Sequence, residues 1–154
     1  MKLQGAVTVP APREQVWPLL LDPIQLCKVI PGCEQARQLD ETHYEAILAV
    51  KIQFMTIRSK ARGSILTAEE PRLLVGELVG EPLAMAGAFR ARVTLELMPA
   101  SQNVQATTIQ YTMDLTMLGR LASLGEAIVR TTSQRLTREF AENVARLFAD
   151  SHSS

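Results

Sequence analysis

The chain has 154 residues, with 16 basic and 16 acidic side chains and only 5% aromatic residues. A length of this order is typical of one domain, and the balanced charge gives no whole-chain attraction for nucleic acid. The sequence has no run of about 18 consecutive apolar residues, the length that a membrane-spanning helix needs, and it begins with a strand pattern rather than a cleavable signal. We therefore expect one domain over residues 1–150, a frayed tail over 151–154, and no nucleic-acid partner.

The first part of the chain predicts a strand followed by two short helices. Residues 3–9 alternate valines with small or polar residues and stop at a proline, as a strand does. Residues 12–21 have a helical apolar face, and Pro18 makes this helix either short or bent. A second helix begins at Asp22-Pro23, which offer a cap and a first turn, and ends at Pro31-Gly32.

Alternating apolar and polar residues predict a run of strands from residue 35 onward. The expected strands cover 35–39, 44–52, 56–67, 73–79, 89–97 and 108–117, with a hairpin turn at 40–42. Each strand has one apolar and one polar face, which is typical of an antiparallel sheet that faces the core on one side only. We expect about seven strands in this sheet.

The last segment, residues 119–149, predicts one long helix with an apolar face. That face is small and lightly polar in its first half, at Gly125 and Thr132, and bulky in its second half, at Leu136, Phe140 and Val144. We therefore expect tight packing near the end of the helix and spare room near its start. The elements together predict an α+β fold in which a curved antiparallel sheet wraps around the C-terminal helix.

The two cysteines, Cys27 and Cys33, are six residues apart and flank the Pro31-Gly32 turn. A metal site would need further ligands nearby, and the only histidines are His43 and His152. The rest of the chain is typical of a cytosolic protein, in which thiols stay reduced. We therefore expect reduced, partly buried thiols rather than a disulfide or a metal site.

The order of these elements and several local motifs resemble a known family. The motifs are Val9-Pro-Ala-Pro-Arg-Glu-Gln-Val-Trp17, Asp22-Pro23, Ile30-Pro-Gly-Cys-Glu34, Val50-Lys51 and Gly119-Arg-Leu-Ala-Ser-Leu-Gly125. Over nearly the whole chain they resemble the carbon monoxide dehydrogenase G-subunit family of the START-like (SRPBCC, polyketide cyclase-like) superfamily. The resemblance implies a helix-grip, Bet v 1-like fold with two short helices after the first strand.

The same resemblance implies a function. The family's fold holds apolar ligands between sheet and helix. Members of the family accompany molybdenum-containing carbon monoxide dehydrogenases and are implicated in linking them to the membrane and its quinones. We therefore expect a non-enzymatic accessory protein that binds a quinone or lipid, has no covalently bound cofactor, and pairs with a molybdenum hydroxylase of this type. It would be cytoplasmic and peripheral at the inner face of the membrane.

The expected cavity lies between the inner face of the sheet and the first half of the long helix. Its predicted ligand-binding residues are Val50, Ile52, Phe89, Ala91, Tyr111, Met113, Leu124, Gly125, Ile128 and Thr132. The alternative is that they close into an ordinary packed core. The extensive sheet, the small helix residues and the adaptable inner-face methionines favour a cavity. The Tyr111 hydroxyl would bond either a polar head such as a quinone carbonyl or a backbone group.

A bulky turn and several basic residues are candidates for membrane or partner contact. The family often has a glycine-rich turn after its Val-Lys pair, whereas this chain has Phe54 and Met55 there. These two side chains either plug the core or form an exposed apolar tip. Arg58, Lys60 and Arg62 share one side of the following strand, where they are either solvated or contact an acidic protein surface or anionic lipid headgroups. Arg90 and Arg92 would extend this basic band if their strand lies close.

Catalysis has little support in the sequence. General acid–base chemistry needs a titratable group at the apolar site, and the predicted inner faces contain none. No nucleophile with a base and no phosphate-binding glycine loop is present. We therefore predict no catalytic and no metal-binding residue. Two alternatives stay open, namely a cyclase- or hydrolase-like START enzyme and an assembly or maturation factor with an incidental cavity.

Overall fold

The computed structural model of the chain describes residues 1–100 and 103–152. Its elements in chain order are β1 (Lys2–Val9), α1 (Arg13–Leu21), α2 (Pro23–Val29), β2 (Cys33–Gln38), β3 (His43–Ile52), β4 (Met55–Glu69), β5 (Leu73–Pro82), β6 (Gly87–Ala100), β7 (Asn103–Gly119), the 3-10 helix η1 (Arg120–Leu124) and α3 (Glu126–His152).

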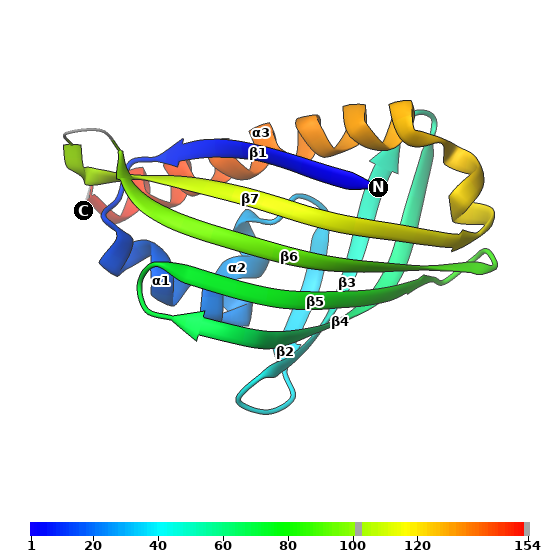
Figure 1. Cartoon of the computed structure of the whole chain (residues 1–154), viewed down its shortest axis with the longest axis horizontal. Coiled ribbons are helices and arrows are strands. Elements are labelled where there is room, and N and C mark those ends of the chain that lie inside the picture. The colour runs from blue at the N-terminus through cyan, green and yellow to red at the C-terminus, as the bar shows by residue number, and fades with distance from the viewer. Residues whose placement is uncertain (101–102, 153–154) are drawn as a thin grey trace.

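The strands form one seven-stranded sheet in the order β1-β7-β6-β5-β4-β3-β2. Every neighbouring pair is antiparallel. From β3 to β7 each strand pairs with the one before it in the chain, and β1 pairs with β7. The sheet curves so strongly that β3 and β4 run across the direction of β5, β6 and β7, and α3 lies along its inner side (Figure 1). The predicted helix-grip fold is confirmed.

The packed core lies toward the C-terminal end of α3. Val144 of α3 is fully buried and belongs to one apolar cluster with Trp17 of α1, Val29 of α2 and Leu97 of β6. Phe140 packs against the same cluster from α3. Figure 1 shows α1 at this end of the molecule, close to the C-terminus. Tight packing near the end of the helix, which the sequence predicts, is thus found at Val144, whereas Leu136 and Phe140 are half-buried.

The long C-terminal helix begins later than predicted. Residues 119–149 were expected to form one helix, but η1 and α3 are separated at Gly125, where φ is +85°. This left-handed backbone conformation breaks the helical hydrogen-bond pattern and is one that glycine adopts without strain. Glu126 then opens α3 with a negative charge at its positive end. The helix continues to His152, past residue 150 where we expected the domain to end, and residues 153–154 lie outside the described residues.

The prediction of reduced thiols is wrong, because Cys27 and Cys33 form a disulfide with their Cα atoms 5.2 Å apart. The turn at Gly32 brings them together. Gly32 has φ +80°, its carbonyl accepts a 2.7 Å hydrogen bond from Ala49 N, and a Cβ there would clash with the Ala49 carbonyl. The chain therefore folds β2 back against α2 within the Cα separation that disulfides require. Sequence spacing alone does not show that the two side chains face each other.

Candidate ligand-binding cavity

A cavity of about 540 Å³ lies between the curved sheet and α3. Every helix and every strand from β1 to β7 except β2 contributes residues to its wall or to the turns beside it, and most of them are aliphatic or aromatic. No Asp, Glu, Lys, Arg, His or Cys is among the described residues that line it, so its one ionisable side chain is Tyr111. Such a space suits an uncharged, largely apolar molecule, because an ionised group would lose its hydration there.

Three hydrogen bonds from α3 to backbone carbonyls hold the helix across the open side of the sheet. Arg130 donates to Lys2 O of β1, Arg135 to Lys51 O of β3, and Asn143 to Val29 O of α2. The helix is thus attached to the edge strand β1 on one side and to β3, the neighbour of the other edge strand, and α2 on the other side. Its residues over the cavity are small or of moderate size until Phe140, so the space below is not filled.

The structure places most of the predicted ligand-binding residues on the cavity wall. Seven line it: Val50, Ile52, Phe89, Tyr111, Met113, Leu124 and Thr132. Three do not. Ala91 is buried among its neighbours at 1% exposure, Gly125 lies at the break before α3, and Val129 takes the place of Ile128. Both Ile128 and Val129 lie in α3, and only Val129 lines the cavity. Ligand binding at these positions stays a prediction.

Sequence reasoning missed several wall residues. Among them are Leu20, Leu26 and Ile30 from α1, α2 and the turn after it, Leu74 and Leu95 from β5 and β6, Leu121 from η1, Leu136 and Phe140 from α3, and Ser59 from β4. The apolar face of the second short helix is a signal that could have found Leu26 and Ile30. The alternation along β4 also places Ser59 on the inner face, between Ile57 and Ala61, but a serine carries no sign of a cavity by itself.

The Tyr111 hydroxyl bonds another side chain, an outcome that neither predicted alternative named. Its oxygen lies 2.9 Å from Thr137 Oγ1 of α3, and Thr137 Oγ1 donates to Ser133 O at 2.8 Å. Since the Thr137 proton is used in that bond, Tyr111 is the donor to Thr137. The ring lies over Gly5 of β1, where a Cβ would come within 2.7 Å of the Tyr111 oxygen. The pair joins β7 to the middle of α3.

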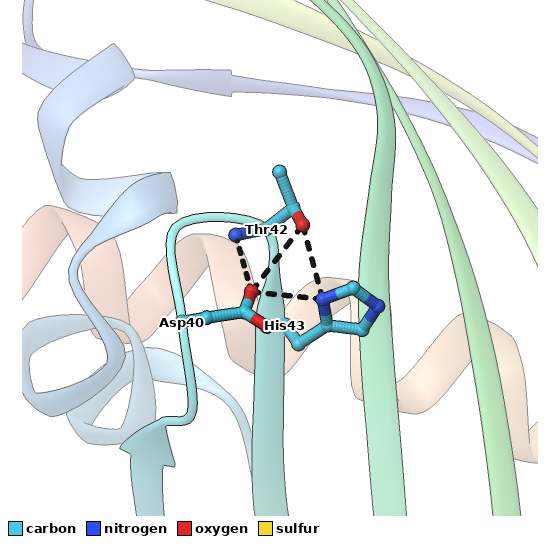
Figure 2. Close-up of polar contacts among 3 residues, drawn as sticks. All are labelled: Asp40, Thr42 and His43. Atoms are coloured by element: carbon cyan, nitrogen blue, oxygen red, sulfur yellow. Dashed lines mark hydrogen bonds and ion pairs between the residues drawn. The ribbon is translucent and has the colours of Figure 1, made fainter.

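His43, the histidine with a described side chain, is the first residue of β3 and lies beside the turn from β2, outside the cavity lining. Figure 2 shows Asp40, Thr42 and His43 bonded to one another. Asp40 Oδ1 accepts from Thr42 N at 2.9 Å and lies 2.8 Å from His43 Nδ1. The backbone hydrogen bond from Thr42, and then the contact with His43, lower the pKa of Asp40. This cluster stabilises an exposed turn, and its three residues are not part of the cavity wall.

Similarity to known proteins places the chain in a family. The family model for CoxG, the G-subunit of carbon monoxide dehydrogenase, matches residues 5–148. The chain belongs to this family. No curated protein matches it. The predicted family is therefore confirmed, and the family's name describes a component of carbon monoxide dehydrogenase.

The solved structures show the fold. A conserved protein from Geobacillus kaustophilus has a TM-score of 0.87 and 24% identity, and the match covers 99% of this chain and 97% of that one. A START superfamily protein from Mycobacterium smegmatis has a TM-score of 0.67 and 11% identity, with 94% of each chain covered. The Zhui aromatase/cyclase from Streptomyces sp. R1128 has a TM-score of 0.65 and 14% identity, with 94% of this chain and 91% of that one covered. The CoxG chain thus has a START-like fold that other proteins use for different functions.

The basic residues of β4 that were predicted to contact a membrane or partner are paired with glutamates. Arg58 bonds Glu34 of β2, and Lys60 and Arg62 lie 3.7 and 3.5 Å from the Glu45 carboxylate of β3. Burial raises the pKa of Glu45, but the surrounding cations outweigh this effect and lower the pKa overall. The polar side of β4 is therefore partly neutralised. Its contact with another molecule stays a prediction.

The expected basic band is also interrupted. β5 lies between β4 and β6, so Arg90 and Arg92 are one strand away from the β4 cations. β5 places Glu77 opposite Arg92 and Glu81 opposite Lys60. The outer face of the sheet is consequently a mixed surface of both charge signs rather than a basic one.

The turn between β3 and β4 is an exposed apolar tip. Phe54 is fully exposed and Met55 is 43% exposed, which excludes the alternative that they plug the core. Because the strands alternate in direction, the connection between β5 and β6 and the end of β7 lie at the same end of the sheet, and they carry the exposed Leu83 and Leu118. None of the helices in the described part of the chain has the length and hydropathy needed to cross a membrane.

Proposed function

We propose that this CoxG-family protein is a non-enzymatic carrier of an uncharged apolar ligand, a quinone or a similar lipid, for a molybdenum-containing enzyme of the carbon monoxide dehydrogenase type. The observation that carries the proposal is the cavity of about 540 Å³, whose described wall holds no charged side chain. That volume lies within the range of small-molecule sites, so it takes a quinone ring with part of its tail.

The wall chemistry favours a carrier over an enzyme. A cyclase- or hydrolase-like reaction needs a group that gives or takes a proton at the bound substrate. Tyr111 is the ionisable residue of the described wall, and its proton is engaged with Thr137. An apolar wall with hydroxyl groups holds and orients a ligand without offering a strong acid, base or nucleophile.

Membrane linkage is supported by the apolar tip. Phe54, Met55, Leu83 and Leu118 expose apolar surface at the end of the sheet where η1, whose Leu121 and Leu124 line the cavity, begins. A carrier that exchanges a lipid-soluble ligand with a bilayer gains from an apolar contact close to its cavity. The small size of this surface fits transient docking rather than permanent anchoring.

The experiment that tests the carrier function is mass spectrometry of lipids extracted from the protein after purification from bacterial cells. We expect a neutral lipid or quinone at a stoichiometry that survives gel filtration. Recovery of only fatty acids or anionic phospholipids, or of no lipid at all, would contradict the proposal. Co-purification with a molybdenum hydroxylase from a host that makes one tests the partner separately.

A further inference from the structure

Ser59 is a buried hydroxyl with no hydrogen-bond partner in the described part of the chain. It lies on the inner face of β4, lines the cavity and is only 6% exposed. Every described side-chain nitrogen or oxygen that is fully enclosed by protein atoms has a partner. The Ser59 oxygen must therefore border the cavity space. Thr132 and Ser133 also line the cavity, but they are less buried, so water reaches them more easily.

Two half-buried hydroxyls of the cavity wall, those of Tyr111 and Thr137, already donate their protons. Thr137 donates to Ser133 O, and Tyr111 in turn donates to Thr137. The Tyr111 oxygen can therefore still accept a hydrogen bond, but it cannot donate one without breaking this chain. A ligand carbonyl needs a donor, so Tyr111 is the wrong partner for it in this arrangement.

We propose that Ser59 donates a hydrogen bond to a carbonyl oxygen of the bound ligand and so selects carbonyl compounds among uncharged apolar molecules. The proposal rests on the carrier function above and names the ligand group that the cavity recognises. When an apolar ligand displaces water from the cavity, the Ser59 proton is left unpaired, and an unmet buried donor is costly. A quinone, ketone or ester carbonyl removes that cost, whereas a hydrocarbon does not.

Isothermal titration calorimetry with two probes of equal tail length tests this proposal. The probes are decyl-1,4-benzoquinone, which has carbonyl acceptors, and decylbenzene, which has none. We expect Ser59→Ala to weaken benzoquinone binding about 3- to 10-fold, the range for one hydrogen bond, and to leave decylbenzene binding unchanged. Ser59→Thr keeps a hydroxyl and should retain most of the preference for the benzoquinone.

Ser64→Ala is the matched control, because Ser64 lies on the same strand but does not line the cavity. It should change the affinity for neither probe. Equal weakening of both probes by Ser59→Ala, or no weakening of either, would overturn the role of Ser59 while leaving the carrier function in place. If the wild-type protein binds neither probe, the carrier function itself fails together with the proposal.

Discussion

Replacing Thr132 by tryptophan tests whether the space beside α3 is a ligand cavity or part of a packed core. Thr132 lies on the cavity wall in the first third of α3. The two residue types differ little in helix propensity, so the backbone alone is nearly unaffected. If the space is real, the indole fills it without displacing its neighbours, and the protein keeps its stability while its ligand capacity falls.

The size of the effect that would be expected without a cavity follows from the cost of overpacking a core. In a close-packed core, the larger side chain costs about 1–3 kcal/mol of unfolding free energy. For a chain of this size that loss lowers the melting temperature by roughly 2–12 °C. We expect instead little change or a small rise in melting temperature, together with a clear loss of decyl-1,4-benzoquinone binding in calorimetry.

The control variant is Thr131→Trp, which changes the neighbouring and exposed residue of the same helix. It should leave benzoquinone binding intact. A fall of many degrees for Thr132→Trp with unchanged ligand binding would refute the assignment of the cavity, because it would show that the site was already filled and that ligands bind elsewhere.

Two further predictions concern the surface. Phe54 and Met55 together would bury about 100–200 Å² of apolar surface in a bilayer, which is worth about 2.5–5 kcal/mol of transfer free energy at about 25 cal/mol per Å². We therefore expect weak and reversible association with vesicles. The double variant Phe54→Asp, Met55→Asp should abolish co-sedimentation with the vesicles. The control is Leu39→Asp, which changes an exposed apolar residue of another turn and should leave co-sedimentation unchanged. Association that survives the double substitution would contradict the docking site. The second prediction concerns the lowered pKa of Asp40. The ionised carboxylate contributes stability above the unfolded pKa of about 3.8, and this contribution is lost as the pH falls through the lower folded pKa. His43→Ala should raise the pKa of Asp40 toward its usual value in an NMR titration, and an unchanged pKa would show that His43 plays no part.

The periodicities of the sequence predicted the type and order of the strands and helices, apart from the break between η1 and α3 at Gly125. Alternation with a period of two marks each strand, since successive side chains of a strand point to opposite faces. The change from small residues at Thr132 to bulky ones at Phe140 and Val144 also indicated where α3 packs and where it leaves space. These properties are local, so they can be read along the chain.

The individual residues of the cavity wall were predicted less accurately than the secondary structure. Ile128 was placed on the wall because the helix was expected to run on from residue 119. The structure has a break at Gly125, where φ is +85°, and it places Val129 rather than Ile128 on the cavity wall. A glycine in a helical pattern is compatible with a continuous helix or with a break, and the folded structure shows which of the two occurs.

The sequence by itself determined the α+β class, the one-sided antiparallel sheet, the family and the apolar character of the cavity, because these depend on residue type and spacing. Only the tertiary structure decided which polar groups are satisfied. The pairing of Cys27 with Cys33, the ion pairs of Lys60 and Arg62 with Glu45, and the unpaired hydroxyl of Ser59 all depend on distances between segments far apart or facing across a turn. Hydrogen bonds and ion pairs act over a few ångströms, so their presence follows from the folded coordinates and not from the order of residues.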